Sequence, residues 1–192
     1  MTDLAKPKAP PLPDGRRNEN PSDIGFWALI REDLATHDHD WTAQGFWALF
    51  WHRFGNWRMG VRPKILRLPL SLFYRIMFKA TEIFCGIKLS YNVKVGRRVR
   101  IDHFGGIVLG ARAIGNDVIL RQNTTLGISA PDDLNAKPVL MDKVNVGAGA
   151  VIVGNIVIGE GSVIGANAVV TKDVPPFSLV LGIPGRVVRQ LG

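Results

Sequence analysis

The dipeptide Asp102-His103, followed closely by Gly105 and Gly106, is the part of this sequence best suited to proton-transfer chemistry. An imidazole titrates near neutral pH, so a positioned histidine can accept a proton from a substrate. A single histidine is more often structural than catalytic. Here the adjacent carboxylate and the two glycines, which let a ligand approach the backbone closely, favour a catalytic His103.

The remaining histidines and the single cysteine lie outside this region. His37, His39 and His52 fall in a segment with a helical pattern. Cys85 stands at the expected end of a helix, which favours a structural role over that of an acyl-enzyme nucleophile. One cysteine excludes an internal disulfide and is typical of a reducing cytoplasm. Residues 1–21 are predicted to be a disordered leader and lack the apolar segment of a signal peptide.

Aliphatic residues recur every six positions in the second half of the chain. The recurring residues are Leu140, Val146, Ile152, Ile158, Ile164 and Val170. Neither a helix nor a simple strand has this period, whereas a β-helix places one hexapeptide on each flat side of a triangular coil. We therefore predict a left-handed parallel β-helix over residues 87–176, with about five coils, and a C-terminal segment at 177–192.

Two irregularities interrupt the repeat near His103. The steps from Ile101 to Leu109 and from Leu109 to Ile114 are not multiples of six. Residues 127–139 have no aliphatic register and many turn-forming residues, which predicts a loop. Loops that leave a rigid solenoid are common binding sites, so we expect the functional site here.

The region before the repeats, residues 22–86, reads as helical, with helices expected at about 22–38, 42–59 and 64–85. Its charge is uneven: residues 51–100 contain 12 Lys or Arg and one acid, Glu82. This pattern fits either a solvated basic face or contact with an anionic partner, such as acidic phospholipid, a pyrophosphate-linked intermediate or nucleic acid. Peripheral contact with an anionic membrane is one expectation.

The run GRRVRIDHFGGIVLG resembles the serine acetyltransferase signature, in which a histidine follows an aspartate and precedes a glycine-containing turn. The runs NTTLG, VGAGAVIVGNIVIGEGSVIGANAVV and VPPFSLVLGIPGRVV are similar to the repeats and C-terminal segment of the same family. The likeness covers about residues 25–190. Polysaccharide O-acetyltransferases of the colanic-acid type look at least as similar, because they share the helix LFYRIMFKATEIFCGI followed by a GRR…DH segment.

The resemblance implies an acetyl-CoA-dependent O-acetyltransferase with direct transfer. His103 would act as general base on an acceptor hydroxyl, a role worth about 10²–10⁴ in rate. It also implies a homotrimer, or a dimer of trimers, with CoA lying between subunits. Positions that match the family's CoA contacts are Gly127, Ala148 and Ala166, with Lys172 and Arg186 available for the phosphates. Packing of the β-helix alone would also require the three small residues, so both interpretations stay open.

No metal is expected. A metal-dependent carbonic anhydrase of the γ type uses this fold but needs three histidines from the repeats, and only His103 lies there. A structural or nucleic-acid-binding solenoid is the other alternative. Acetyl-CoA binding would separate it from an enzyme, and we expect no nucleic-acid partner.

The sequence departs from the family pattern at the acceptor site. Serine acetyltransferases carry an aspartate fifteen residues before the catalytic histidine, and here that residue is Lys88; the family's next histidine is Ser90. An arginine–histidine pair that helps hold the amino acid is replaced by Ala136 and Lys137. A carboxylate thereby loses its bidentate partner. Lys88 and Lys137 become candidate substrate-binding residues.

These departures favour a sugar hydroxyl of an exopolysaccharide or lipid-linked saccharide as the acceptor. The alternative is serine O-acetylation for cysteine biosynthesis. Either enzyme is expected in the cytoplasm, and the basic helices would allow the enzyme to act at the inner face of the membrane.

Overall fold

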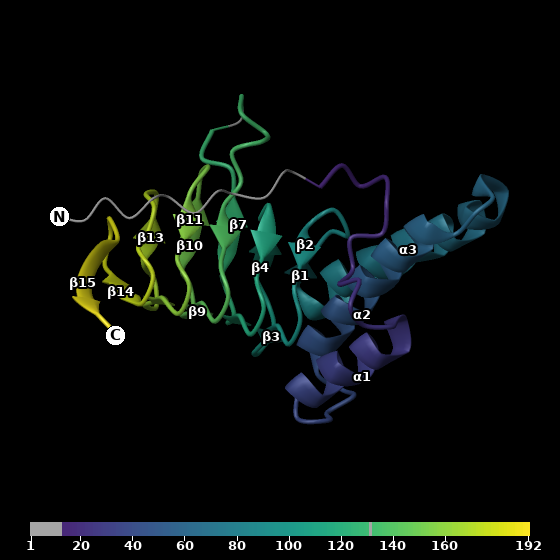
Figure 1. Ribbon diagram of the computed structural model, residues 1–192, viewed down its shortest axis with the longest axis horizontal. Helices are drawn as coiled ribbons and strands as arrows, with labels where there is room; N and C mark the ends of the chain where they lie inside the picture. The colour runs from purple at the N-terminus through teal and green to yellow at the C-terminus, as the bar shows by residue number, and fades with distance from the viewer. Residues whose placement is uncertain (1–12, 131) are drawn as a thin grey trace.

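In the computed structural model, which describes residues 13–130 and 132–192, three α-helices lead into a solenoid of short strands (Figure 1). The helical elements are α1 (Phe26–Thr36), α2 (Gln44–Trp57), the 3-10 turn η1 (Arg58–Gly60) and α3 (Lys64–Cys85). The third helix has the range expected from the sequence. It ends at Gly86, whose φ of 62° places it in the left-handed conformation that terminates helices.

The strands form three sheets, one for each wall of the solenoid. The first contains β1 (Ile87–Lys88), β4 (Ile107–Leu109), β7 (Thr125–Gly127), β10 (Val151–Val153) and β13 (Val169–Val170). The second contains β2 (Lys94–Val95), β5 (Ala113–Ile114), β8 (Val139–Leu140) and β11 (Val157–Ile158). The third contains β3 (Arg100–Ile101), β6 (Ile119–Leu120), β9 (Asn145–Val146), β12 (Val163–Ile164), β14 (Ser178–Leu181) and β15 (Arg186–Gln190).

Every pairing is parallel except that of β14 with β15. The aliphatic residues of successive coils therefore stack in register: Leu109 pairs with Leu126, Leu126 with Ile152, and Ile152 with Val170. All four side chains are buried. This continuous inward row is the physical reason for the period of six, and it confirms the predicted left-handed β-helix preceded by helices.

A buried ion pair joins the helices to the first coil. The Arg53 side chain in α2 bonds Asp33 in α1 with an Nε–Oδ2 distance of 2.9 Å, and both side chains are fully buried. The same guanidinium donates to the carbonyl oxygens of Val95 (2.8 Å) and Gly96 (2.6 Å). Burial raises the pKa of Asp33 against the opposing effect of Arg53. The Arg53 guanidinium thus holds α1, α2 and the first coil together.

Two histidines of the helical region serve as packing and hydrogen-bonding groups. His52 lies 2.9 Å from the Val93 carbonyl oxygen through Nε2, and burial lowers its pKa to about 3, so it stays neutral. The Ile101 N–H donates to Nε2 of His37, while Nδ1 of His37 lies 2.7 Å from the Asp33 carbonyl oxygen. An acceptor at Nε2 leaves Nδ1 as the donor.

Residues of the expected leader fall in two parts. Residues 1–12 lie outside the described residues. Further along, the Glu19 N–H donates to Asn56 Oδ1 at 3.1 Å, and Asn20 Nδ2 donates to the Arg53 carbonyl oxygen at 2.9 Å. Residues 19–20 therefore run against α2.

Candidate active site

His103 lies in the turn between β3 and β4, where one coil is longer than the others. In this coil, Val108 of the first sheet comes seven residues after Ile101 of the third sheet. In the next coil, the residues that pair with them, Leu120 and Thr125, are only five residues apart. The turns after β9 and β12 also take five steps to the paired residues of the first sheet. Two additional residues therefore project the turn that carries His103, which accounts for the irregular spacing in the sequence.

The backbone of this turn is held in unusual conformations. His103 has a φ of 65°, a region that residues with a side chain seldom adopt, and Gly105 and Gly106 have φ values of 92° and 66°. The His103 side chain is exposed. The described residues of this chain provide no hydrogen-bond partner for its imidazole. Backbone strain of this kind persists where the surrounding structure enforces it and is concentrated at functional sites.

The end of α3 enforces the turn. The Gly105 N–H donates to the Cys85 carbonyl oxygen at 3.1 Å, and the Ile107 N–H donates to the Gly86 carbonyl oxygen at 3.0 Å. A Cβ on Gly86 would lie only 2.8 Å from the Gly105 Cα. Glycine is thus required for the helix end and the turn to come so close. Cys85 supplies a backbone acceptor here, and burial raises the pKa of its thiol, which disfavours the nucleophilic thiolate.

Asp102 is directed toward the helices by an arginine. Arg100 Nε lies 2.5 Å from Asp102 Oδ1, while Arg100 Nη2 lies 2.7 Å from Asp38 Oδ2. A third bond joins Arg100 Nη1 to the Thr36 carbonyl oxygen at 2.8 Å. The Asp102 carboxylate therefore fixes the strand before the turn, and it makes no hydrogen bond to His103.

Small residues line the same corner of the solenoid beyond His103. In successive coils the corner between the third and first sheets is formed by Gly105–Gly106, Gln122–Asn123, Ala148–Gly149 and Ala166–Asn167. Hydrogen bonds stack these turns: Asn123 N–H to the Gly105 oxygen (3.1 Å), Gly149 N–H to the Gln122 oxygen (2.9 Å) and Asn167 N–H to the Ala148 oxygen (2.8 Å). The structure thus brings Ala148 and Ala166 into line with His103. Ala148 and Ala166 leave the backbone open to a narrow acyl-carrier chain, whereas Gln122, Asn123 and Asn167 place longer polar side chains along the same edge.

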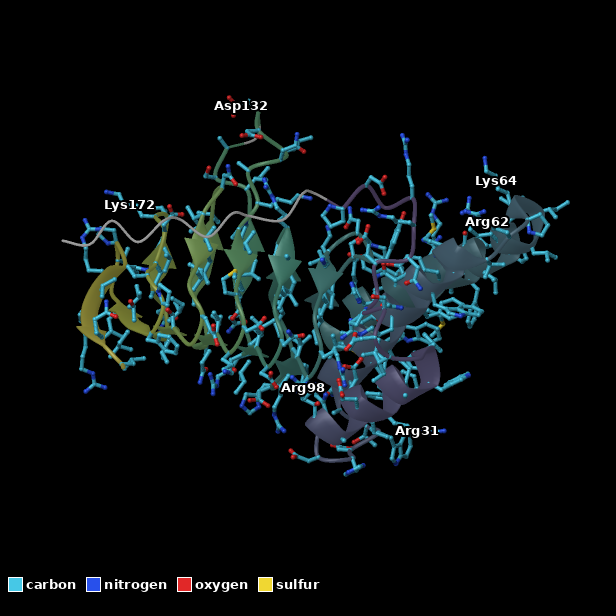
Figure 2. The ribbon with its side chains drawn as sticks, in the orientation of Figure 1. Arg31, Arg62, Lys64, Arg98, Asp132 and Lys172 are labelled. Carbon is cyan, nitrogen blue, oxygen red and sulfur yellow. The ribbon has the colours of Figure 1, made fainter. Side chains whose placement is uncertain are left out.

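The other predicted CoA contacts lie elsewhere on the solenoid. Gly127 is at the opposite edge of the first sheet, where the Gly154 N–H donates to its carbonyl oxygen at 3.0 Å. Lys172 follows β13 at this second edge (Figure 2). Arg186 begins β15 at the far end of the third sheet and is exposed. Within one chain these three residues do not join the His103 corner.

The candidate acceptor residues lie on the first sheet and in the loop. Lys88 is exposed at the end of β1 and pairs with Val108, so its side chain stands on the outer face that the His103 turn borders. The loop 127–139 projects from the upper edge of the solenoid, with β3 and β9 along the lower edge (Figure 1). Arg112 Nη2 supports the loop by donating to the Asn135 carbonyl oxygen at 3.0 Å. Ala136 is buried and Lys137 is half-buried.

Gln122 is a site candidate that the sequence reasoning missed. It lies one coil beyond Gly105, and its Oε1 atom is buried without a hydrogen-bond partner in the described chain. A buried acceptor without a donor is costly, so this oxygen is available to a neighbouring N–H or a ligand. Its position between Leu120 and Leu126 of the repeat is the one feature of the sequence that could have indicated Gln122 as a site residue.

The fold and the corner can now be compared with known proteins. The model of the bacterial transferase hexapeptide family (six repeats) matches residues 137–172. The serine acetyltransferase of Bacillus subtilis is 35% identical over 172 residues, covering 87% of this chain and 79% of that protein. The serine acetyltransferase of Mycobacterium tuberculosis is 40% identical over 147 residues, covering 76% and 61%. The structure of soybean serine acetyltransferase complexed with serine has a TM-score of 0.71 at 29% identity, covering 85% of this chain and 69% of that one.

Proposed function

Because this chain belongs to the serine acetyltransferase family, we propose that it transfers the acetyl group of acetyl-CoA to the hydroxyl group of serine, with His103 as general base. Family membership makes the chain an acetyl-CoA-dependent acyltransferase. The identity of the acceptor and the role of each residue are the parts that we propose. The projecting, strained turn of His103 beside a corner of small residues carries the proposal.

The prediction of a saccharide acceptor is wrong. Relatives at 35–40% identity are serine acetyltransferases, and so are the structural neighbours. The four changed side chains, Lys88, Ser90, Ala136 and Lys137, are outweighed by the similarity of the whole chain. Substitutions in a pocket change the affinity for an acceptor. Similarity along most of the chain reflects common ancestry.

In the proposed reaction His103 accepts the proton of the serine hydroxyl while the serine oxygen attacks the thioester carbonyl carbon. The carbon–sulfur bond then breaks, and the proton held by the imidazole passes to the departing thiolate of CoA. An alcohol is a weak nucleophile at neutral pH, so the base is needed at this step. Lys88 stands where the family has an aspartate, and a lysine cannot accept the imidazole proton. The ring has no acceptor in the single described chain, and we propose that it turns to Gln122 Oε1, which is buried without a partner one coil beyond Gly105.

We further propose a homotrimer, or a dimer of trimers, with CoA held between neighbouring subunits. An outward row of β-branched side chains on the first sheet supports this arrangement. Val108 pairs with Thr125, Thr125 with Val151, and Val151 with Val169, so three of the four are apolar. Val108 is 40% exposed in the single chain. A neighbouring subunit would cover this row and bring Gly127 and Lys172 of one chain toward the His103 corner of another. The single cysteine supports the cytoplasm, a reducing compartment, as the location of the enzyme.

Mass spectrometry tests the acceptor. The protein with acetyl-CoA and L-serine is expected to form O-acetylserine and free CoA in equal amounts. D-serine and L-alanine are the controls, because the first presents the hydroxyl in the wrong geometry and the second has none. Release of CoA without O-acetylserine would contradict serine as the acceptor.

The loop supplies a second test. Lys137 stands at one of the two positions where the family's arginine–histidine pair helps to hold the amino acid, so its ammonium group would pair with the serine carboxylate. Lys137→Ala is expected to raise KM for serine by about 10-fold and leave kcat nearly unchanged, because a charge-assisted bond made in both ground and transition states is lost. Lys137→Arg should restore the low KM, and Lys143→Ala is the matched control. An unchanged KM in Lys137→Ala would remove this residue from the acceptor site.

A further inference from the structure

The third helix exposes its apolar side to solvent. Its inward side carries the buried residues Tyr74 and Thr81. The outward side carries a stripe at helical spacing, formed by Ile65, Leu68, Leu72, Ile76 and Ile83. Ile65 and Leu68 are 71% and 68% exposed. The usual orientation of an amphipathic helix is thus reversed, and a large apolar surface is left without cover in this chain.

Basic side chains border the stripe. Lys64, Arg75 and Lys79 lie along one side of it and are exposed. At the free end of α3 a hollow of 530 Å³ is lined by four cations, Arg16, Arg62, Lys64 and Arg67, and by no carboxylate of residues 13–130 or 132–192. Figure 2 shows Arg62 and Lys64 at this end of the helix, away from the loop that contains Asp132. The hollow therefore offers converging positive charge to an anion.

Seven basic residues lie between positions 53 and 79, and two of them do not belong to this surface. Arg53 is fully buried in its pair with Asp33. Arg58 is buried and stacks on the rings of Tyr74 and Tyr91 at 4.6 and 4.5 Å from their centroids. The other five, Arg62, Lys64, Arg67, Arg75 and Lys79, remain at the surface, and Glu82 is the one acid of α3, paired with Lys79.

Aromatic rings continue the apolar surface onto the other helices. Phe73 is 46% exposed on α3 and packs against Trp51 and Phe54 of α2, with centroid distances of 5.6 and 5.9 Å. Together with Phe73, Trp27 and Trp57 line a second, aromatic hollow, and both are exposed. Indole rings favour the boundary between lipid headgroups and acyl chains.

We infer that α3 is a docking surface for an anionic phospholipid bilayer. The helix would lie in the plane of the interface, with Leu68, Leu72 and Ile76 among the upper acyl segments and the cations of the hollow on lipid phosphates. A second copy of the chain fits this face less well, because each copy would bring four cations without a carboxylate partner on α3, namely Arg62, Lys64, Arg67 and Arg75. No helix of the described residues has the length and apolar character to cross a bilayer, so the contact is peripheral.

The surface is separate from the acetyl-transfer site. α3 extends away from the solenoid, and its free end lies at the opposite end of the molecule from β15 (Figure 1). Variants of this end therefore test lipid binding without altering the residues of catalysis. Retained acetyl transfer in such variants keeps the two proposals distinguishable.

Vesicle sedimentation with the full chain tests the inference. We expect binding to vesicles of phosphatidylcholine mixed with phosphatidylglycerol, weak binding to phosphatidylcholine alone, and loss of binding at high salt. The triple variant Arg62→Gln, Lys64→Gln, Arg67→Gln should bind anionic vesicles on the order of 100-fold more weakly. The variant Lys94→Gln, Lys143→Gln, Arg189→Gln changes the net charge equally and should bind nearly as the parent protein.

The apolar stripe is tested separately with Leu68→Ser, Leu72→Ser, which should also weaken binding to anionic vesicles. Equal sedimentation with neutral and anionic vesicles would overturn the inference. So would unchanged binding of the triple variant. If the serine variant instead lowers the molecular mass in solution and leaves vesicle binding unchanged, the stripe is an interface between copies of this chain.

Discussion

Replacing His103 with alanine is expected to lower kcat for acetyl transfer by about 10²–10⁴. The variant keeps every contact described for the turn, because these are made by the backbone of Gly105 and Ile107. What it loses is the group that accepts the hydroxyl proton. Acetyl-CoA affinity should change little, since Ala148 and Ala166 lie two and three coils beyond Gly105. Calorimetry with acetyl-CoA and a thiol-release assay with L-serine measure the two quantities.

His103→Asn is the matched control for this experiment. Asparagine tolerates a φ of 65° well, so it preserves the turn but cannot act as a base near neutral pH. Both variants should keep the molecular mass of the parent protein, which we expect light scattering to give as about three chains or a multiple of three. Full activity in His103→Ala, with that mass unchanged, would contradict the mechanism.

Arg53→Met is expected to lower the free energy of unfolding by about 3–5 kcal/mol. The substitution leaves the Asp33 carboxylate buried without its cation and removes the donors to the Val95 and Gly96 carbonyl oxygens. A loss of this size is a large part of the stability of an ordinary domain. Urea unfolding followed by tryptophan fluorescence measures it, since the aromatic residues of α2 lie close by.

Arg97→Met is the matched control, because Arg97 pairs with Glu32 and Asp23 at a partly exposed site. Its loss should leave the urea midpoint nearly unchanged, because solvent screens an exposed ion pair. The double variant Arg53→Met, Asp33→Leu should recover much of the stability, because no buried charge is left alone. If Arg53→Met unfolds at the same urea concentration as the parent protein, the ion pair does not hold the helices on the first coil.

The solenoid could be predicted because one residue type at one spacing defines it. Each hexapeptide forms one wall, so a separation of 18 residues predicts from local sequence that Val146 stacks on Ile164 and Ile152 on Val170. The helix at 64–85 was equally local, with Pro63 before its first residue and Gly86 as its cap. The projecting turn of His103 was visible as a break in the same spacing.

The location of charged residues could not be predicted in this way. Arg53 and Arg58 belong to a run of basic residues, yet both are buried. Arg53 pairs with Asp33 and Arg58 stacks on Tyr74 and Tyr91, and these partners lie on other segments of the chain. Asp102 stands next to His103 in the chain but bonds Arg100 instead. Gln122 draws no attention in the sequence, and only the stacking of coils places it beyond Gly105.

The attachment of the loop 127–139 to the solenoid has an evolutionary consequence. Its two ends leave from strands that are already paired: Gly127 lies in register with Val153, and Val139 with both Ala113 and Val157. The coils on either side therefore keep their pairing whatever the loop contains. Mutation can exchange Ala136 and Lys137, or lengthen the segment, while the turn of His103 retains its shape. Descendants of one ancestral acyltransferase can thus acquire new acceptors by rebuilding this single segment.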